Sequence, residues 1–181
     1  MEQNYDLIAT ATQIDNTINA MAEQIIKDYP TTPLFVALMR GAAPFASKLM
    51  FAIAKLNVSY HPELDYMMVS TYGHDRTASQ PVIVTDLAPS TIVKGRDIVL
   101  LDDVIDQGIT SDFVKDLLLC RGAISVELAV LATKDVPARK SQADYYGFDA
   151  GDKWLVGMGL DDAKVTNEAY RWTSDIWEIR H

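Results

Sequence analysis

The feature that most constrains the fold is a short apolar run that ends in acidic residues and is followed by a glycine. Asp97 to Leu101 reads Asp-Ile-Val-Leu-Leu, and consecutive β-branched and aliphatic residues are typical of a buried strand in a parallel sheet. Asp102 and Asp103 come next, and Gly108 gives the backbone the freedom for a tight turn into a helix that opens at Thr110. The segment therefore predicts a strand, an acidic loop and a helix N-terminus, in that order.

This loop carries groups for two kinds of ligand. The amides of residues 107–110, the positive end of the helix and the Thr110 hydroxyl suit a phosphate monoester. Asp102 and Asp103 can hold Mg²⁺ or the hydroxyls of a sugar, and Asp106 can face a reacting group. A plain surface turn is the alternative, but such a turn would place cations between acids that repel one another, and none stands between these.

The segment resembles the phosphoribosyl diphosphate (PRPP) signature of type I phosphoribosyltransferases. That signature has four apolar residues, two acids, two apolar residues, Asp, a small hydroxyl residue, Gly, any residue and Thr. The chain is most similar to the hypoxanthine-guanine branch, from which it departs at Asp102, where Glu is usual, and at Gln107, where Thr or Ser is usual. The resemblance implies that Asp106 takes or holds the purine N7 proton and that PRPP is bound by Asp102, Asp103, Gln107, Gly108, Ile109 and Thr110.

Length and composition fit one α/β unit. The chain has 181 residues, 49% of them apolar, and no apolar run of the length needed to span a membrane. The N-terminus lacks the pattern of a signal peptide, so we expect a cytoplasmic protein without membrane contact. A net charge of −9 argues against nucleic-acid binding through phosphates. Cys120 is the only cysteine, and we expect it to be a buried structural thiol.

A second βα turn lies earlier in the chain. Residues 34–39 form an apolar run that predicts a buried strand, and a helix with Phe45, Leu49, Ile53 and Leu56 on its apolar face follows. Between them stands Met39-Arg40-Gly41, which on its own is most simply a plain βα turn. The resemblance implies that Met39, Arg40 and Gly41 are instead the pyrophosphate loop, often with a cis peptide before the cation, and that Arg40 stabilises the leaving group.

A polar segment without periodicity follows the next strand. Residues 65–72 predict a strand, 73–80 predict a loop, and 81–86 predict the returning strand. The resemblance implies that Ser70 and Tyr72 lead into a flexible catalytic loop, which closes to exclude water from a reactive intermediate.

The second half of the chain supplies candidates for base recognition. Lys134 follows a predicted strand at 126–133, and Trp154 and Leu155 begin a short one. A solvated lysine and a core aromatic residue are the simplest alternatives. The resemblance implies that Lys134 donates to the exocyclic oxygen of a 6-oxopurine, that Trp154 stacks on the purine with Leu155 beside it, and that Asp161 binds a second Mg²⁺. It also points to Arg171 as a pyrophosphate ligand, displaced by about four residues inserted after Asp161.

Taken over the chain, the resemblance implies a doubly wound α/β fold with a mostly parallel sheet. It implies a single domain, residues 1–181, with a small hood formed by the N-terminal segment and roughly 135–181, including a last strand at 176–179. The implied activity is purine salvage: Mg²⁺-dependent transfer of phosphoribose from PRPP to hypoxanthine or guanine, giving IMP or GMP and pyrophosphate. The implied assembly is a homodimer or homotetramer.

Two other classes of function compete with this interpretation. Some proteins of this fold are regulators that bind PRPP or nucleotides with little catalysis, but those carry a DNA-binding domain or a basic RNA-binding face that this acidic chain does not show. A metal-binding module such as a phospho-acceptor domain would explain the acids, but not Lys134 or Trp154. The sequence does not choose between hypoxanthine, guanine and xanthine.

Overall fold

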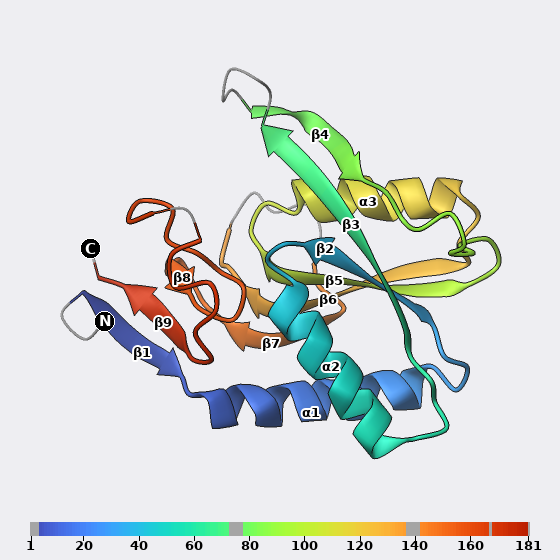
Figure 1. Ribbon diagram of the computed structural model, residues 1–181, viewed down its shortest axis with the longest axis horizontal. Coiled ribbons are helices and arrows are strands. Elements are labelled where there is room, and N and C mark those ends of the chain that lie inside the picture. The colour runs from blue at the N-terminus through green and yellow to red at the C-terminus, as the bar shows by residue number, and fades with distance from the viewer. Residues whose placement is uncertain (1–3, 73–77, 137–141, 167, 181) are drawn as a thin grey trace.

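The computed structural model describes residues 4–72, 78–136, 142–166 and 168–180. Its centre is a six-stranded sheet with the spatial order β4-β3-β2-β5-β6-β7 (Figure 1). The strands are β2 Leu34–Met39, β3 Glu63–Tyr72, β4 Ala78–Thr85, β5 Asp97–Ile105, β6 Ser125–Thr133 and β7 Tyr145–Asp149. All neighbouring pairs are parallel except β3 and β4. The predicted mostly parallel sheet is confirmed.

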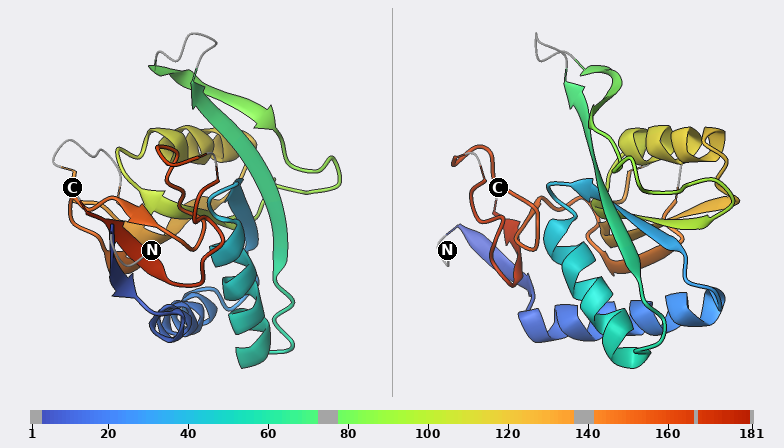
Figure 2. Two further views of the ribbon diagram at one scale, coloured as in Figure 1. Left: turned by 60° about the vertical axis from the view of Figure 1, so that its left-hand side comes forward. Right: turned by 45° about the vertical axis from the view of Figure 1, so that its right-hand side comes forward.

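Helices cover both faces of this sheet. Helices α1 (Ala11–Asp28) and α2 (Ala43–Leu56) pack together on one face, and α3 (Ile109–Cys120) lies on the other (Figure 2). Helix α1 buries Ile14, Ile18 and Ile25 on one stripe, as apolar residues at helical spacing predict. The sheet is therefore doubly wound, and its parallel strands carry their carboxyl ends to one edge, where ligands bind in folds of this kind.

A second, antiparallel sheet joins strands from the two ends of the described chain. Its order is β1 (Tyr5–Ala9), β9 (Ile176–Ile179) and β8 (Leu155–Val156). The strand at 176–179 is confirmed, but β1 and β7 were not predicted. In β7 the signal is interrupted by Gly147, where an added Cβ would lie 2.6 Å from the Leu131 carbonyl oxygen. Glycine at this position thus lets β7 approach the Leu131 carbonyl of β6 closely, although it weakens the sequence pattern of a strand.

Several predicted boundaries were wrong. Strand β5 continues to Ile105, which pairs with Thr133 of β6, so the adjacent acids at 102 and 103 lie within a strand and not in a loop. Strand β3 starts earlier, at Glu63, and β4 starts at Ala78 inside the predicted loop; residues 73–77 of that loop lie outside the described residues. In each case the backbone forms hydrogen bonds with a neighbouring strand. Such backbone pairing does not depend on side-chain polarity, so polar residues can extend the strand.

Two expectations about burial also fail. Cys120 is exposed at the end of α3, where Val114 and Leu118 are the buried positions. Leu56 is 44% exposed, because Ile53 is the last residue of α2 that reaches the core. None of the helices in the described ranges has the length and apolar character needed to cross a membrane.

Candidate active site

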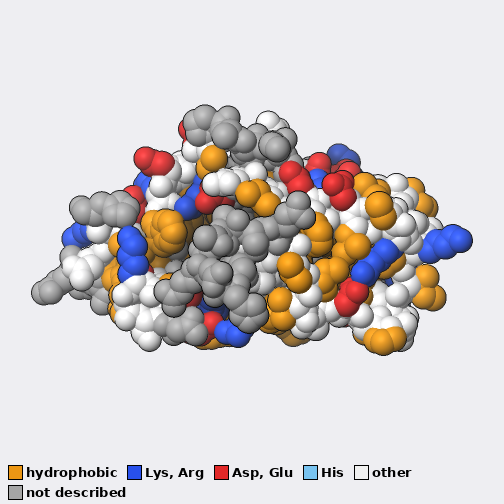
Figure 3. Space-filling model, turned by 90° about the horizontal axis from the view of Figure 1, so that it is seen from above, with side chains coloured by type: hydrophobic (Ala, Val, Ile, Leu, Met, Phe, Trp, Pro, Cys, Tyr) orange, Lys and Arg blue, Asp and Glu red, His pale blue; other side chains and the backbone are white. Residues whose placement is uncertain are grey.

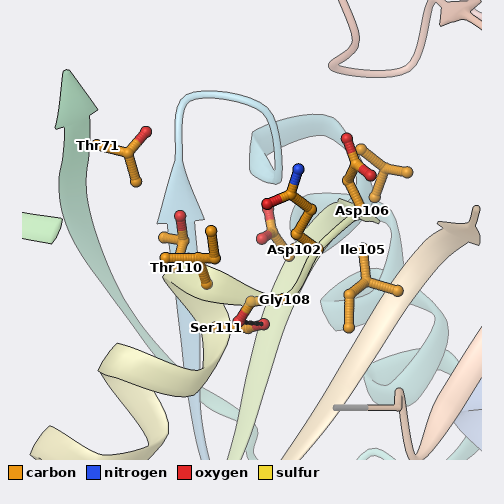
Figure 4. A pocket seen from close by; sticks show the side chains of 10 residues that line it. Thr71, Asp102, Ile105, Asp106, Gly108, Thr110 and Ser111 are labelled. Atoms are coloured by element: carbon orange, nitrogen blue, oxygen red, sulfur yellow. Dashed lines mark hydrogen bonds between the residues drawn. The ribbon is translucent and has the colours of Figure 1, made fainter. Parts of the chain in front are cut away.

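A hollow of about 340 Å³ opens where β5 ends and α3 begins. We call it the loop hollow (Figure 4). It is lined by Thr71, Asp102, Val104, Ile105, Asp106, Gln107, Gly108, Ile109, Thr110 and Ser111. Five of the residues predicted to bind PRPP therefore lie around one cavity, with Thr71 of β3 on its far wall.

The backbone turn at Gly108 shapes the floor of the loop hollow. Gly108 is buried, and its backbone has φ +80°, a conformation that residues other than glycine rarely adopt. Its carbonyl oxygen accepts hydrogen bonds from the Ser111 hydroxyl at 3.1 Å and from the Asp112 amide at 2.9 Å. The first amides of α3 have no acceptor within the helix. They form the positive end of α3, a position that favours a phosphate group.

Two adjacent carboxylates stand at the end of β5. The Asp102 carboxylate accepts from the Asp103 amide at 3.0 Å, and the Asp103 carboxylate accepts from the Val104 amide at 2.8 Å. Burial, and then the negative charge of Asp103, raise the pKa of Asp102 well above its ordinary value; burial likewise raises the pKa of Asp103. A bound cation would relieve this repulsion.

The donor set at these acids fits Mg²⁺ in one specific way. Mg²⁺ is commonly held by one or two carboxylates together with phosphate oxygens of a substrate and water. No group of three carboxylate, histidine or cysteine side chains within the described ranges is arranged to hold a metal ion. Asp102 and Asp103 would therefore bind the ion together with a phosphorylated ligand rather than alone.

The Arg40 turn lies directly against these acids. The Met39–Arg40 peptide bond is cis, as the resemblance implies. At Gly41 an added Cβ would lie 1.9 Å from Oδ2 of Asp103, and at Gly159, with φ +109°, it would lie 1.8 Å from the Gly41 carbonyl oxygen. Glycines at both positions thus let the turn pass between the acidic strand and the Gly159 segment.

Four charged side chains form an ion-pair network beside this turn, which we call the arginine cluster: Arg40, Asp161, Glu168 and Arg171. Glu168 accepts from Arg40 at 2.6 Å and from Nε of Arg171 at 2.5 Å, and Arg171 also pairs with Asp161 at 2.8 Å. Desolvation acts to raise the pKa of Glu168, but the hydrogen bonds from Arg171 and Arg40 outweigh it and lower the pKa. The predicted metal ligand Asp161 is therefore bound to a guanidinium here.

Lys134 and Trp154 meet at the same edge of the sheet. The Lys134 amide donates to the Ile105 carbonyl oxygen at 3.1 Å, which ties it to the end of β5. Its ammonium lies 4.5 Å from the centre of the Trp154 ring, a cation–π contact. Trp154 is 47% exposed, whereas the Leu155 side chain is buried in the core, so only the backbone of Leu155 can face a ligand.

Sequence reasoning missed two residues of the site. Thr71 lines the loop hollow, and its neighbour Ser70 does not. Successive side chains of a strand point to opposite faces. This alternation was the sequence signal that Ser70 and Thr71 face different sides of the sheet. The Tyr72 side chain lies outside the described residues. Glu168 was not predicted as a site residue, although its spacing of three from Arg171 allowed an ion pair.

The surface around this edge carries mixed charge. On the face shown in Figure 3, acidic side chains stand in small groups among basic and hydrophobic ones.

Comparison with known proteins places the chain in a family. Residues 5–163 match the model of the phosphoribosyl transferase domain. The chain is 35% identical to a hypoxanthine-guanine phosphoribosyltransferase of Streptococcus thermophilus over 83% of its own length and 82% of that protein. It is 33% identical to the Bacillus subtilis protein of the same name, over 84% and 82%.

Solved structures agree with this match. A hypoxanthine phosphoribosyltransferase of Staphylococcus aureus superposes with a TM-score of 0.84 at 28% identity, covering 99% of this chain and 93% of that one. The chain belongs to the phosphoribosyltransferase family, in the branch of the hypoxanthine-guanine enzymes.

Proposed function

We propose that this protein transfers phosphoribose from PRPP to hypoxanthine or guanine, releasing pyrophosphate and giving IMP or GMP. The observation that carries the proposal is that one edge of the sheet brings together the loop hollow, the arginine cluster and the Lys134–Trp154 pair. These groups suit a phosphate monoester, a pyrophosphate and a purine, respectively. The names of the similar proteins support the same substrates.

The 5-phosphate of PRPP would lie in the loop hollow. There the first amides of α3 donate hydrogen bonds, with the Thr110 hydroxyl as a further donor. Asp102 and Asp103, at the end of β5, would accept from the ribose hydroxyls and share the metal ion. Bound Mg²⁺ would supply positive charge that neutralises the pyrophosphate as it leaves.

The arginine cluster would receive the pyrophosphate. Arg40 and Arg171 now share the carboxylate of Glu168, and a more highly charged diphosphate competes for the same donors. Charge builds on the leaving group in the transition state, so contacts that strengthen with that charge accelerate the reaction.

The purine would stack on Trp154 in the place that the Lys134 ammonium now occupies. Lys134 would then donate to the 6-oxo group, and the exposed carboxylate of Asp106 would accept the N7 proton. Adenine carries an amino group at that position, which would face a cation without an acceptor. The geometry therefore favours 6-oxopurines.

A substrate panel tests the proposal. PRPP and Mg²⁺ are offered with hypoxanthine, guanine, xanthine, adenine and uracil, and the nucleotide formed is measured. We expect product from hypoxanthine and guanine and none from adenine. PRPP binding without product from any base would favour a regulatory protein of the same fold instead.

Base selection has its own test at Lys134. Lys134→Ala should raise the KM for hypoxanthine and guanine by roughly tenfold or more, because the site then loses its donor to the 6-oxo group, while the KM for PRPP changes little. Lys164→Ala is the matched control, since its ammonium lies farther from the same ring, at 5.9 Å. An equal loss in both variants would contradict the role given to Lys134.

A further inference from the structure

One buried carboxylate lies beside the segment that delivers the arginine cluster. Residues 161–171, which we call the 161–171 loop, contribute Asp161, Glu168 and Arg171 to the cluster; residue 167 lies outside the described residues. Asp162 follows Asp161 directly and is only 3% exposed. Contacts that fix Asp162 therefore also fix the backbone next to a residue of the cluster.

Asp162 closes the 161–171 loop with both its side chain and its backbone. Its Oδ1 accepts from the Lys164 amide at 3.1 Å, and its carbonyl oxygen accepts from the Val165 amide at 3.0 Å. Its own amide donates to the Ala169 carbonyl oxygen at 3.0 Å. Because Ala169 follows Glu168 directly, this last bond holds the start of the loop against its end.

A tyrosine from the other end of the chain holds the same carboxylate. The Tyr5 hydroxyl donates to Oδ2 of Asp162 at 3.0 Å, across 157 positions of the chain. Tyr5 begins β1, which pairs with β9 (Figure 1), and its ring meets the Tyr170 ring edge to face with centroids 5.0 Å apart. Tyr5 therefore contacts both ends of the loop, next to Asp161 and next to Arg171.

The end of the 161–171 loop has a backbone conformation that needs such support. Glu168 and Tyr170 have φ +66° and +62°, in the left-handed region that residues other than glycine rarely adopt. Such conformations cost free energy and persist only where surrounding contacts fix them. The hydrogen bond from Asp162 to Ala169 and the packing of Tyr170 on Tyr5 are contacts of this kind.

The Asp162 carboxylate is better suited to fixing a conformation than to adding stability. It takes part in none of the ion pairs formed within the described ranges. Moving a carboxylate out of water costs free energy, which hydrogen bonds from neutral groups offset only in part. Both of its oxygens have donors only when Tyr5 and the loop are in place, so the bonds favour one arrangement of the loop.

Arg171 is the side chain that this arrangement places. Its guanidinium donates to the Gly159 carbonyl oxygen and to Glu168, and it pairs with Asp161 at 2.8 Å. The Arg171 side chain is 11% exposed, whereas that of Arg40 is 58% exposed. A guanidinium binds an anion through a planar fork of N–H groups, so its orientation decides how well it binds.

We propose that Asp162 is a positioning residue for the pyrophosphate site and that Tyr5 acts with it. Both side chains are buried, so they act through the 161–171 loop, which they hold so that Arg171 presents its guanidinium to the diphosphate. The inference rests on the proposed function, because it gives the pair a role in binding the diphosphate of PRPP. It assigns to β1 a part in that site.

Two hydroxyl deletions give a matched test. Tyr5→Phe removes the hydrogen bond to Asp162, and Tyr60→Phe removes one to the Tyr29 carbonyl oxygen at the end of α1. Tyr5 and Tyr60 are 5% and 6% exposed, so we expect similar decreases in melting temperature. Only Tyr5→Phe should raise the KM for PRPP and the inhibition constant of pyrophosphate, by roughly threefold, with the KM for hypoxanthine unchanged. Equal kinetic constants in the two variants would overturn the proposal.

Substitutions of the carboxylate extend the test. Asp162→Ala should raise the same two constants by roughly tenfold, the value of one charge-assisted hydrogen bond. Asp162→Asn keeps the size of the side chain and one acceptor oxygen, so it should restore part of the loss. An equal rise in the KM for hypoxanthine would overturn the proposal, because it would indicate a general loosening of the fold. If Asp162→Ala does not fold, Asp162→Asn and Tyr5→Phe carry the same comparison.

A measurement that needs no catalysis separates this inference from the proposed function. The Nε–H group of Arg171 donates to Glu168, so it should give a slowly exchanging signal in ¹⁵N NMR, identified by its loss in Arg171→Lys. We expect this signal to persist in Tyr60→Phe and to weaken in Tyr5→Phe. An unchanged signal in both would overturn the role of Tyr5 and Asp162 even if the protein forms nucleotide. A signal that responds as expected in a protein that forms no nucleotide would support the positioning role and overturn the proposed reaction alone.

Discussion

The loop hollow and the arginine cluster lie side by side but satisfy their charges differently. In the loop hollow, Asp102 and Asp106 pair with no cation of the described chain, and a buried glycine and helix amides shape the floor. In the arginine cluster, each guanidinium already has a carboxylate: Arg40 binds Glu168, and Arg171 binds both Glu168 and Asp161.

This difference separates two ways of receiving an anion. Backbone amides at a helix start are fixed before the ligand arrives, so little reorganisation is needed. Side chains in an ion pair must first exchange their carboxylate partner for the anion, and the loss of the first partner offsets part of the binding free energy. We therefore expect changes of single atoms in the loop hollow to alter the kinetic constants strongly. Removing an internal carboxylate of the arginine cluster should alter them weakly, or even lower the KM for PRPP.

The largest effect is expected at the open carboxylate of the loop hollow. Asp106→Asn keeps the size of the side chain but removes the basic oxygen, so kcat should fall roughly 100-fold while the KM for PRPP changes little. Steady-state kinetics over a range of PRPP and Mg²⁺ measures both constants. Asp103→Asn is the contrast: its carboxylate is assigned to ribose and metal, so it should mainly raise the requirement for PRPP or Mg²⁺. Near-normal turnover of Asp106→Asn at saturating Mg²⁺ would mean that the two roles are reversed.

The contact between the two regions should also be sensitive to added atoms. Gly159→Ala places a Cβ 1.8 Å from the Gly41 carbonyl oxygen at φ +109°, and we expect a loss of about 2–3 kcal/mol in the free energy of unfolding. Chemical denaturation measures it. Gly151→Ala is the matched control, because Gly151 also has positive φ, +59°, but has open space around its Cβ position. Its loss should be about 1 kcal/mol, and equal losses would show that the close approach is unimportant.

Local chemistry made much of this architecture predictable. The Val99–Leu101 run, the glycine after it and the strand at 34–39 each carry a pattern that neighbours in sequence determine, and the structure places them as expected. The resemblance implied the cis peptide before Arg40, which is present. These features are local, so a short stretch of sequence contains their cause.

Features that depend on distant residues were not predictable. Strand β5 extends through Asp102 and Asp103 because β6 pairs with it as far as Thr133, and no residue near the acids signals that pairing. Glu168 joins Arg40 across 128 positions of the chain. Partners this far apart leave no periodic trace in sequence, so the Arg40–Glu168 ion pair became visible only in the folded chain.

A moderate gain, in contrast to the losses above, is expected when Glu168 is changed. Glu168→Gln removes the charge that Arg40 and Arg171 share, which frees Arg40 for pyrophosphate and leaves Arg171 paired with Asp161 alone, so the KM for PRPP should fall by roughly threefold. Glu63→Gln is the control: Glu63 pairs with Arg96 at the start of β3, away from the site, and should leave the constant unchanged. A raised KM in Glu168→Gln alone would show that the carboxylate positions the arginines instead of competing for them.

The smallest effect is expected at Gln107, where the chain departs from the signature of its family. Gln107 is exposed and lines the loop hollow, and a threonine there would offer the phosphate a short hydroxyl donor in place of a longer amide. Gln107→Thr should lower the KM for PRPP by a factor that corresponds to about 1 kcal/mol or less, the net value of one neutral hydrogen bond, and leave the KM for the purine unchanged. Initial rates with PRPP varied at saturating hypoxanthine measure it. Because the loop hollow is held by its backbone, the gain should appear without any change in stability; an unchanged or raised KM would mean that Gln107 already fits the phosphate.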